Sequence, residues 1–383
     1  MGQPAGPFCL PSESASLPPS PIRPTHPSGM HLAPLSGDAY HVLGWAVSNL
    51  PPIDQDPLAS GGPPLDATVV VCTYNRRELV ARALESIRRQ VLPDGVSWEV
   101  LVVDNGCTDG TWDVLQQMAG DWERLHPVRE PRPGKSFALN TAIRRARGAV
   151  LAFTDDDVVA DPNWLNAILD GFRRFEVAMA GGRVLPLWTT DRPKWYREPE
   201  YRGVIAHWDH GDRPFLLANT SSMPSGNNLA ARAEVLRRFG GFHTGLGAGR
   251  VHRGADSELG VRLFRAGEKI AYLPDAVVYH RVDETLLRRS YVRRWCFRRG
   301  IAQSVIEKPT EAGMPRILGV PRWRYRVLLE ATGRWAQAAV RGDLDAMFYH
   351  ETRLWMAVGF FAERWSERFS NHRAAPTEGR EHA

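Results

Sequence analysis

Lysine, paired cysteines and long apolar runs are scarce in this chain of 383 residues. The four cysteines show neither CxxC pairing nor metal-ligand spacing, which argues against a disulfide framework and a zinc site and favours a reducing compartment. The longest apolar run, LWMAVGFFA at residues 354–362, falls well short of the roughly 20 residues of a spanning helix. We therefore expect a cytoplasmic protein, soluble or held peripherally on the inner face of the membrane.

Basic residues slightly outnumber acidic ones, and almost all of the basic residues are arginine. The formal net charge is +5, and only four of the 48 basic residues are lysine. A basic balance favours anionic partners such as nucleotides, phosphates or an acidic membrane face.

Proline divides the chain into regions. Fourteen of the 29 prolines lie within residues 1–66, so a largely disordered leader is predicted over residues 1–65, with one short helix at residues 38–50. Apolar strands alternate with helices over residues 66–282. Residues 283–383 are predicted to be a helical region with a disordered tail.

The alternation predicts an α/β fold. Buried-type strands are expected at residues 67–74, 98–104 and 149–155, with helices between them, and the helix in KSFALNTAIRRARG is expected to end at its glycine. Such a pattern is typical of a mainly parallel, Rossmann-like sheet that binds ligands at the carboxyl ends of its strands. Further on, a helix is predicted at residues 257–267, followed by two separate strands, KIAYLP and AVVYH.

Three carboxylates, Asp155, Asp156 and Asp157, stand in a row directly after an apolar run. Adjacent carboxylates repel one another, and burial raises their pKa values unless cations compensate. Hard oxygen ligands on a short, open turn suit Mg²⁺ or Mn²⁺. The alternative is a solvated acidic turn, with Asp161 capping the helix that follows.

Five motifs occur in an order and spacing that resembles the family 2 glycosyltransferases: VVVCTYNRRELV, VLVVDNGCTDGT, GKSFALNTAIRRARGAVLAFTDDD, GNNLAARAEVLRRFGGF and GADSELGVRLFRAGEKIAYLPDAVVYH. The resemblance covers about residues 66–282 and not the leader or the C-terminal helices. It implies a GT-A fold and the transfer of a sugar, with inversion, from a nucleotide-diphosphate donor to an acceptor hydroxyl. It also implies a divalent metal cofactor, Mn²⁺ or Mg²⁺.

The resemblance implies roles for single residues on the donor side. Asp155 and Asp157 match the ends of a DxD motif that holds the metal, with Asp157 as the direct ligand, and Asp156 is placed near the donor ribose or sugar. His280 matches a histidine that completes the metal shell or touches the diphosphate, although a histidine at a strand end is often structural. Contacts with the donor nucleotide are implied for Thr73, Tyr74, Asn75, Asp104 and Lys135.

Inverting transfer also needs a base on the acceptor side. GADSELGVR offers Asp256 and Glu258, and the family's Glu-Asp pair aligns with Ala255 and Asp256, so the resemblance assigns the base to Asp256. The departure at Ala255 puts acceptor contacts in doubt. The alternative role for Asp256 is an N-cap of the predicted helix, with Glu258 at its positive end. The donor-sugar and acceptor pocket is expected to include Gly226, Asn227, Asn228 and Glu258.

The C-terminal region bears on partners. YVRRW at residues 291–295 matches only the last two positions of the QxxRW signature, which argues against a processive enzyme. Six arginines between residues 288 and 299 project around every side of a helix, which favours a solvated basic helix over a membrane-binding face, although one or two could neutralise a phosphate-bearing acceptor. The last helix has apolar side chains at helical spacing, predicted to pack on the body, with a membrane-surface face as the alternative: Leu344, Met347, Phe348, Trp355, Val358, Ala362 and Trp365.

The expected partners are a nucleotide-sugar donor, a UDP-sugar in the first place, and a carbohydrate, glycolipid or small-molecule acceptor, as in bacterial polysaccharide biosynthesis. Peripheral membrane contact is compatible with the composition, and no nucleic acid is expected. A metal-dependent nucleotidyltransferase would want a GxxxxGK[ST] loop, and none is present. An inactive glycosyltransferase-like scaffold is the other alternative, and the presence of every acidic site residue argues against it.

Overall fold

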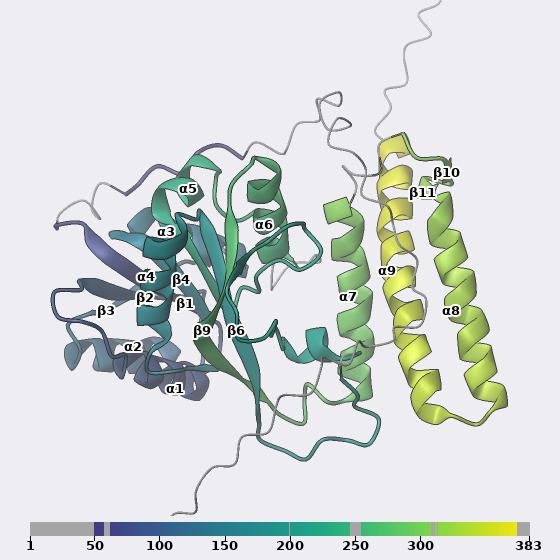
Figure 1. Cartoon of the computed structure of the whole chain (residues 1–383), viewed down its shortest axis with the longest axis horizontal. Coiled ribbons are helices and arrows are strands. Elements are labelled where there is room, and N and C mark those ends of the chain that lie inside the picture. The colour runs from purple at the N-terminus through teal and green to yellow at the C-terminus, as the bar shows by residue number, and fades with distance from the viewer. Residues whose placement is uncertain are drawn as a thin grey trace, which may run out of the picture. The chain divides into compact units, whose positions relative to one another are not determined.

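The computed structural model describes residues 50–56, 62–198, 200–245, 254–307, 311 and 313–373, and only the backbone of residues 367–373. The predicted leader and its short helix lie almost wholly outside these residues. Figure 1 shows the described elements, and each is introduced below with its bounds.

The first half of the sheet is parallel, as the alternation predicts. Its strands stand in the order β3-β2-β1-β4, with bounds β1 (Leu65–Thr73), β2 (Trp98–Asp104), β3 (Leu125–Arg129) and β4 (Gly148–Asp155). The helices between them are α1 (Arg77–Arg88), α2 (Thr111–Gly120) and α3 (Lys135–Arg145). Every residue of β2 is buried, which is expected for a strand covered on both faces. The predicted glycine end of α3 is wrong, because the helix is capped by Ala146 in extended conformation.

The second half of the sheet is mixed. The antiparallel strand β8 follows β4, and the order continues β6-β9-β5, with bounds β5 (Val158–Ala160), β6 (Met179–Trp188), β8 (Asn228–Arg232) and β9 (Ile270–Val282). The short β7 (Phe215–Leu216) pairs with β9. The prediction of two separate strands near residue 275 is wrong, because β9 is continuous. Its register against β6 jumps between Gly182 and Arg183, and the resulting bulge accommodates Pro274 without breaking the strand.

Alternate strand residues build two apolar cores, one on each face of the sheet. Val69 and Val71 of β1 join a core with α1 and α4 (Trp164–Phe175). Val70 and Cys72 join the core on the other face, with α3, α5 (Ala233–Arg238) and α6 (Ala255–Arg265). This period of two is the reason that a central strand reads as one continuous apolar run. The helix α6 begins at Ala255, two residues before the predicted start.

The C-terminal region adds three long helices and a small hairpin that was not predicted. The elements are α7 (Arg289–Glu307), β10 (Arg316–Ile317), β11 (Val320–Pro321), α8 (Arg322–Val340) and α9 (Leu344–Arg373). Figure 1 shows α9 lying between α7 and α8, in agreement with its packing contacts on both helices. Between β6 and β7 the chain forms a short 3-10 helix, η2 (Arg202–Ile205).

The predicted packing face of α9 is largely wrong. Phe348 is buried, but Leu344, Trp355, Val358 and Trp365 remain 66, 38, 46 and 38 % exposed. A helix between two neighbours turns two faces inward, and the apolar stripe found in the sequence runs largely along an outer face. The buried positions of α9 include three phenylalanines, Phe348, Phe360 and Phe361, and two polar residues, Thr352 and Arg364.

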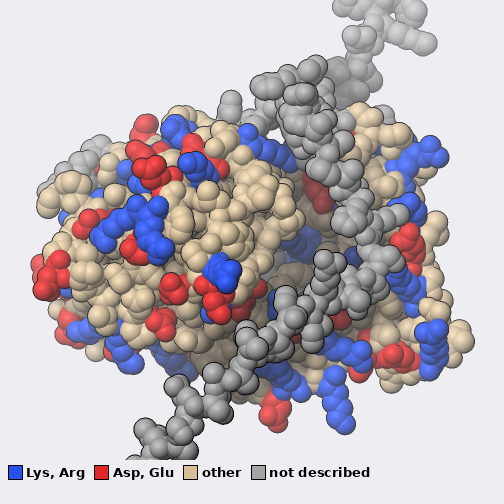
Figure 2. Space-filling view, viewed as in Figure 1, with Lys and Arg blue, Asp and Glu red and all other residues tan. Residues whose placement is uncertain are grey.

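The surface of the described residues is mixed in charge. Figure 2 shows Lys and Arg side chains interspersed with Asp and Glu over this face, without one continuous patch of either sign. None of the helices in the described part of the chain combines the length and apolarity that crossing a bilayer requires.

Candidate active site

Strand pairing brings three predicted site residues to one edge of the sheet. Thr73, at the end of β1, is the register partner of Asp104 at the end of β2. Its neighbour Cys72 is the partner of Asp155 at the end of β4. Because these strands are parallel, their carboxyl ends coincide, and polar side chains from three distant segments meet.

Asp155 is neutralised by Lys135, the first residue of α3. The two side chains form an ion pair. Burial disfavours both charges, but the Lys135 ammonium outweighs it and holds the pKa of Asp155 below its ordinary value. The pKa of Lys135 is raised in turn, because the Asp155 carboxylate outweighs the same desolvation. Both groups therefore stay charged, as a pair.

Asp156 and Asp157 share a cation that the sequence analysis missed. Arg76 Nη1 lies 2.7 Å from Asp156 Oδ1 and 2.8 Å from Asp157 Oδ2. The Thr73 hydroxyl donates a further 2.8 Å hydrogen bond to Asp156. Burial raises the pKa of Asp156 above its ordinary value, and the Arg76 charge opposes that rise. The only sequence signal for Arg76 is its place directly after the TYN motif.

Asp157 and His280 face one another across the β5–β9 pairing. His280 Nε2 lies 3.6 Å from Asp157 Oδ1, and neither that oxygen nor His280 Nδ1, both buried, has a hydrogen-bond partner among the described residues. The described residues contain no group of three side chains that could hold a metal ion, and Asp155 is paired with Lys135. Mg²⁺ is usually held by one or two carboxylates together with substrate phosphates, so a two-residue half-shell fits such an ion.

Hydrogen bonds order the loop after β1 and the loop after β2 and join the two. The side-chain oxygen of Asn75 accepts a 2.7 Å bond from the Thr108 N–H, and Asp104 accepts one of 2.7 Å from the Cys107 N–H. Asn75 has a φ of 49°, a left-handed conformation that asparagine tolerates better than most residues. Tyr74 is 61 % exposed beside this joint. The loops thus form a rigid rim with one free aromatic ring.

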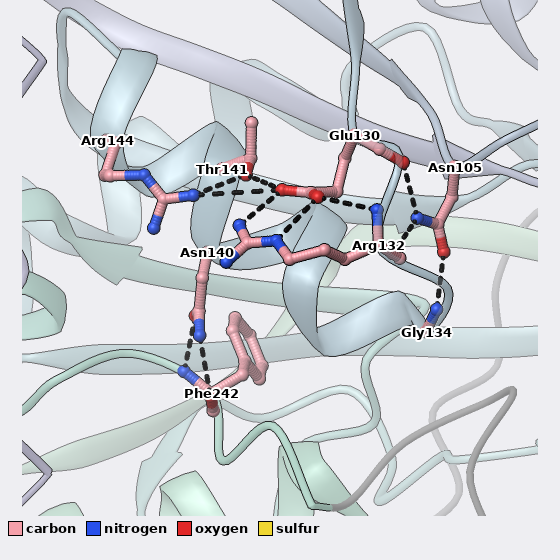
Figure 3. A network of polar contacts seen from close by, with 8 residues as sticks. All are labelled: Asn105, Glu130, Arg132, Gly134, Asn140, Thr141, Arg144 and Phe242. Atoms are coloured by element: carbon pink, nitrogen blue, oxygen red, sulfur yellow. Dashed lines mark hydrogen bonds and ion pairs between the residues drawn. The ribbon is translucent and has the colours of Figure 1, made fainter.

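A second polar network fixes the loop that carries Lys135 (Figure 3). The Asn105 amide donates to the carbonyls of Glu130 and Arg132, at 2.9 and 2.8 Å, and accepts a 2.9 Å bond from the Gly134 N–H. The Glu130 carboxylate binds the Arg132 guanidinium with two bonds of 2.8 and 2.7 Å. Chiefly through Arg132, the pKa of Glu130 falls to about 2. No signal in the sequence pointed to Glu130, and the site residues predicted from it did not include Asn105.

Asp256 is held at the start of α6. The Gly226 N–H donates a 2.8 Å bond to its Oδ2, and a Cβ added at position 226 would lie only 3.4 Å from that oxygen. The next residue, Asn227, accepts a 2.9 Å bond at its carbonyl from Thr154, the neighbour of the acidic triplet. Gly254 occupies the N-cap position of α6, so Asp256 is not the N-cap residue, but its Oδ1 accepts a 2.8 Å bond from the Ser257 N–H in the first turn. One short hydrogen-bonded path therefore joins Asp256 to the end of β4.

Two predicted pocket residues are engaged elsewhere. Asn228 is fully buried, donates to two backbone carbonyls at 2.9 and 2.8 Å, and accepts a 2.8 Å bond from Trp164. Glu258 forms two bonds of 2.8 and 3.0 Å with the buried Arg262. Both side chains therefore hold neighbouring elements together, and their polar atoms are already engaged within the fold. The side-chain oxygen of Asn227 is buried and has no hydrogen-bond partner among the described residues.

Comparison with known proteins identifies the family. The model described as "Glycosyl transferase family 2" matches residues 68–240. A solved structure, the mannosyltransferase PcManGT from Pyrobaculum calidifontis in complex with GDP-Man and Mn²⁺, is 24 % identical with a TM-score of 0.53 and covers 86 % of this chain and 92 % of that one. Residues 68–240 therefore belong to glycosyl transferase family 2, and the sheet with its flanking helices has the GT-A fold, which confirms both predictions.

Curated relatives carry more specific names. Glucosyl-dolichyl phosphate glucuronosyltransferase of Haloferax volcanii is 28 % identical over 235 residues, which are 57 % of this chain and 70 % of that protein. Pre-mycofactocin glycosyltransferase of Mycobacterium tuberculosis is 26 % identical over 322 residues, 78 % of this chain but only 64 % of the relative. The chain thus spans less than two thirds of the second relative.

Proposed function

We propose that this family 2 glycosyltransferase moves a sugar from a nucleotide-diphosphate donor to an acceptor hydroxyl, with inversion at the sugar carbon and with the help of a divalent metal. The observation that carries the proposal is the path from the acidic triplet through Thr154 and Asn227 to Asp256. It connects a donor side, where Lys135 and Arg76 pair with the acidic triplet, with a separate carboxylate. In-line displacement needs a site for the leaving group and a base on opposite sides of the reacting carbon.

On the donor side, the joined loops would hold the nucleoside. The exposed ring of Tyr74 offers a stacking surface, and Asp104 would accept a hydrogen bond from the base. Lys135 and Arg76 bring two positive charges to the end of β4, where the diphosphate would lie. Preorganised cations at the point where leaving-group charge develops lower the barrier to transfer.

Asp157 and His280 are the residues that would hold the metal. The buried Asp157 Oδ1 makes no hydrogen bond among the described residues and lies 3.6 Å from His280 Nε2, which supports this assignment. When bound, Mn²⁺ or Mg²⁺ supplies positive charge that offsets the developing charge of the departing nucleoside diphosphate. The complex of the related PcManGT with GDP-Man and Mn²⁺ gives the same pairing of ligand and ion in another protein.

On the acceptor side, Asp256 would take the proton from the attacking hydroxyl. The Gly226 N–H orients Oδ2. The names of the two curated relatives span a lipid-phosphate-linked acceptor and a small-molecule acceptor. We propose an acceptor in that range, a glycolipid, carbohydrate or small molecule.

The test is Asp256→Asn. We expect donor binding to persist and kcat to fall by about a thousandfold, because general-base catalysis contributes roughly 10²–10⁴. Asp275→Asn, which changes an exposed carboxylate in the bulge of β9, is the control and should transfer normally. Normal transfer by Asp256→Asn would remove it as the base. A panel of UDP-, GDP- and dTDP-sugars with Mn²⁺ that shows neither binding nor turnover would overturn the function itself.

A further inference from the structure

Exposed apolar side chains gather in the C-terminal region. Of the sixteen large hydrophobic residues that are exposed among the described residues, ten lie between Met314 and Trp365. Five of the ten surround the β10–β11 hairpin, and we call them the hairpin patch: Met314, Ile317, Leu318, Trp323 and Trp365. Scattered apolar residues are normal on a surface, but a gathered group marks an interaction site.

The tip of the hairpin carries a side chain that the turn disfavours. Leu318 and Gly319 join the two strands with φ values of 48° and 82°. A two-residue turn with positive φ at both positions favours Asn-Gly, and a leucine there is strained. The Leu318 side chain is also 58 % exposed, so its packing within the described chain does not offset that strain. Strain held at an exposed apolar tip points to a role in binding.

The tip is anchored to the helices. The Tyr325 hydroxyl of α8 donates a 2.9 Å bond to the Ile317 carbonyl. The ring of Tyr325 contacts that of Phe361 at 4.9 Å, and Phe361 contacts Trp365 at 5.6 Å. Figure 1 shows β10 and β11 beside the first turns of α8 and the later part of α9. These contacts tie the hairpin to α8 and α9, the helices that carry Trp323 and Trp365.

The charges around the patch are basic. Arg316, Arg322 and Arg326 are exposed, and of these Arg326 pairs at 3.4 Å with Glu330. The acidic Glu311 of the same segment is buried against Arg364. Leucine, isoleucine and tryptophan beside exposed arginines form the composition of a membrane-interface anchor, in which apolar side chains enter the acyl boundary and arginines meet phosphates.

We propose that the hairpin patch docks this protein on an anionic lipid surface, with Ile317 and Leu318 entering the bilayer interface and Arg316 and Arg322 binding lipid phosphates. A second copy of the chain is the less favoured occupant. A stable protein interface buries roughly 1,200 Å² or more, far beyond a two-residue tip, whereas interfacial anchoring needs only a few apolar side chains and charge attraction. The proposal does not depend on the sugar-transfer activity.

The test is co-sedimentation of the full chain with two kinds of vesicle. One consists of phosphatidylcholine alone, and the other also contains about 30 % of the anionic lipid phosphatidylglycerol. We expect binding to the anionic vesicles that weakens with salt. Leu318→Asn should lower the partition coefficient about tenfold, because it removes the inserted side chain. Asparagine suits the left-handed turn, so the variant should fold at least as well as the parent.

Val340→Asn is the matched control. Val340 is 90 % exposed and ends α8, and Trp323 lies at the other end, so this change removes exposed apolar surface away from the patch and should leave vesicle binding unchanged. Arg316→Gln with Arg322→Gln should reduce binding to the anionic vesicles only. Failure of the parent chain to bind anionic vesicles, or equal binding by Leu318→Asn, would overturn the proposal. Self-association that Leu318→Asn abolishes, measured by light scattering, would assign the patch to a second copy instead.

Discussion

The sheet with its flanking helices and the three C-terminal helices use the same kinds of residue in opposite ways. In the sheet region, apolar side chains fill cores on both faces, and polar groups gather where strands end. In the helical region, small apolar clusters are buried, but ten large apolar side chains stay exposed and a buried ion pair, Glu311 with Arg364, lies within. The first arrangement presents a polar surface to a polar ligand. The second leaves apolar surface exposed and also relies on other means to hold its helices together.

Those other means are close backbone contacts. A Cβ added at Gly300 of α7 would lie 1.9 Å from the Met356 carbonyl oxygen of α9, and one added at Gly359 would lie 2.0 Å from the Phe297 carbonyl oxygen. The two glycines let the helices approach more closely than side chains permit. The comparison teaches that the helical region depends on fit, and the candidate site depends on charge pairing.

The largest effect should come from breaking that fit. We expect Gly300→Val to lower the free energy of unfolding by about 3 kcal/mol, because the side chain forces α7 and α9 apart. Denaturant unfolding followed by tryptophan fluorescence measures it, and donor binding to the native protein should persist. Gly333→Ala is the control, since a Cβ there meets nothing within 4 Å, and it should stabilise α8 by about 1 kcal/mol. Parent-like unfolding of Gly300→Val would refute the close contact.

A smaller effect should come from removing one buried charge pair near the site. The pKa of Glu130 is lowered to about 2 from an ordinary 4.5, so its ionised form stabilises the fold above pH 4.5, and this contribution is lost as the pH falls toward 2. We expect Glu130→Gln to cost about 2 kcal/mol at pH 7 and almost nothing near pH 2, measured by urea unfolding at several pH values.

The control for that change is Glu85→Gln. Glu85 forms an exposed pair with Arg89 at 3.3 Å, and such pairs contribute about 0.3–0.5 kcal/mol. A pH-independent loss in Glu130→Gln would show that the carboxylate acts through packing and not through its charge.

The smallest effect concerns Arg76, which holds oxygens of both Asp156 and Asp157. Because a metal at Asp157 would compete with the guanidinium, we expect Arg76→Ala to raise Mn²⁺ affinity about fivefold without nucleotide, or about 1 kcal/mol. Electron paramagnetic resonance of free Mn²⁺ measures this directly. Arg77→Ala is the control, because Arg77 makes no ion pair with the acidic triplet. A lower Mn²⁺ affinity in Arg76→Ala would contradict competition.

Much of the sheet could be predicted because its signals are local. Continuous apolar runs mark strands buried on both faces, and the polar residues after them, such as Thr73 and Asp104, fall on one edge by the geometry of parallel strands. The bulge in β9 could not be predicted, because Pro274 is tolerated only where the register against β6 shifts. The hairpin was missed because a leucine stands where its turn favours asparagine.

The sequence by itself determined the family, the alternation of strands and helices, and the meeting of Asp104 and Asp155 at one edge, since each follows from short-range pattern. Only the tertiary structure decided which polar groups remain available. Arg76 lies 80 residues from Asp156 along the chain, and the Asn228 amide donates hydrogen bonds to carbonyls that are far from it in sequence. The outward face of α9 was likewise decided by its two neighbours. Pairing and burial depend on what arrives from distant segments, and no local pattern encodes that.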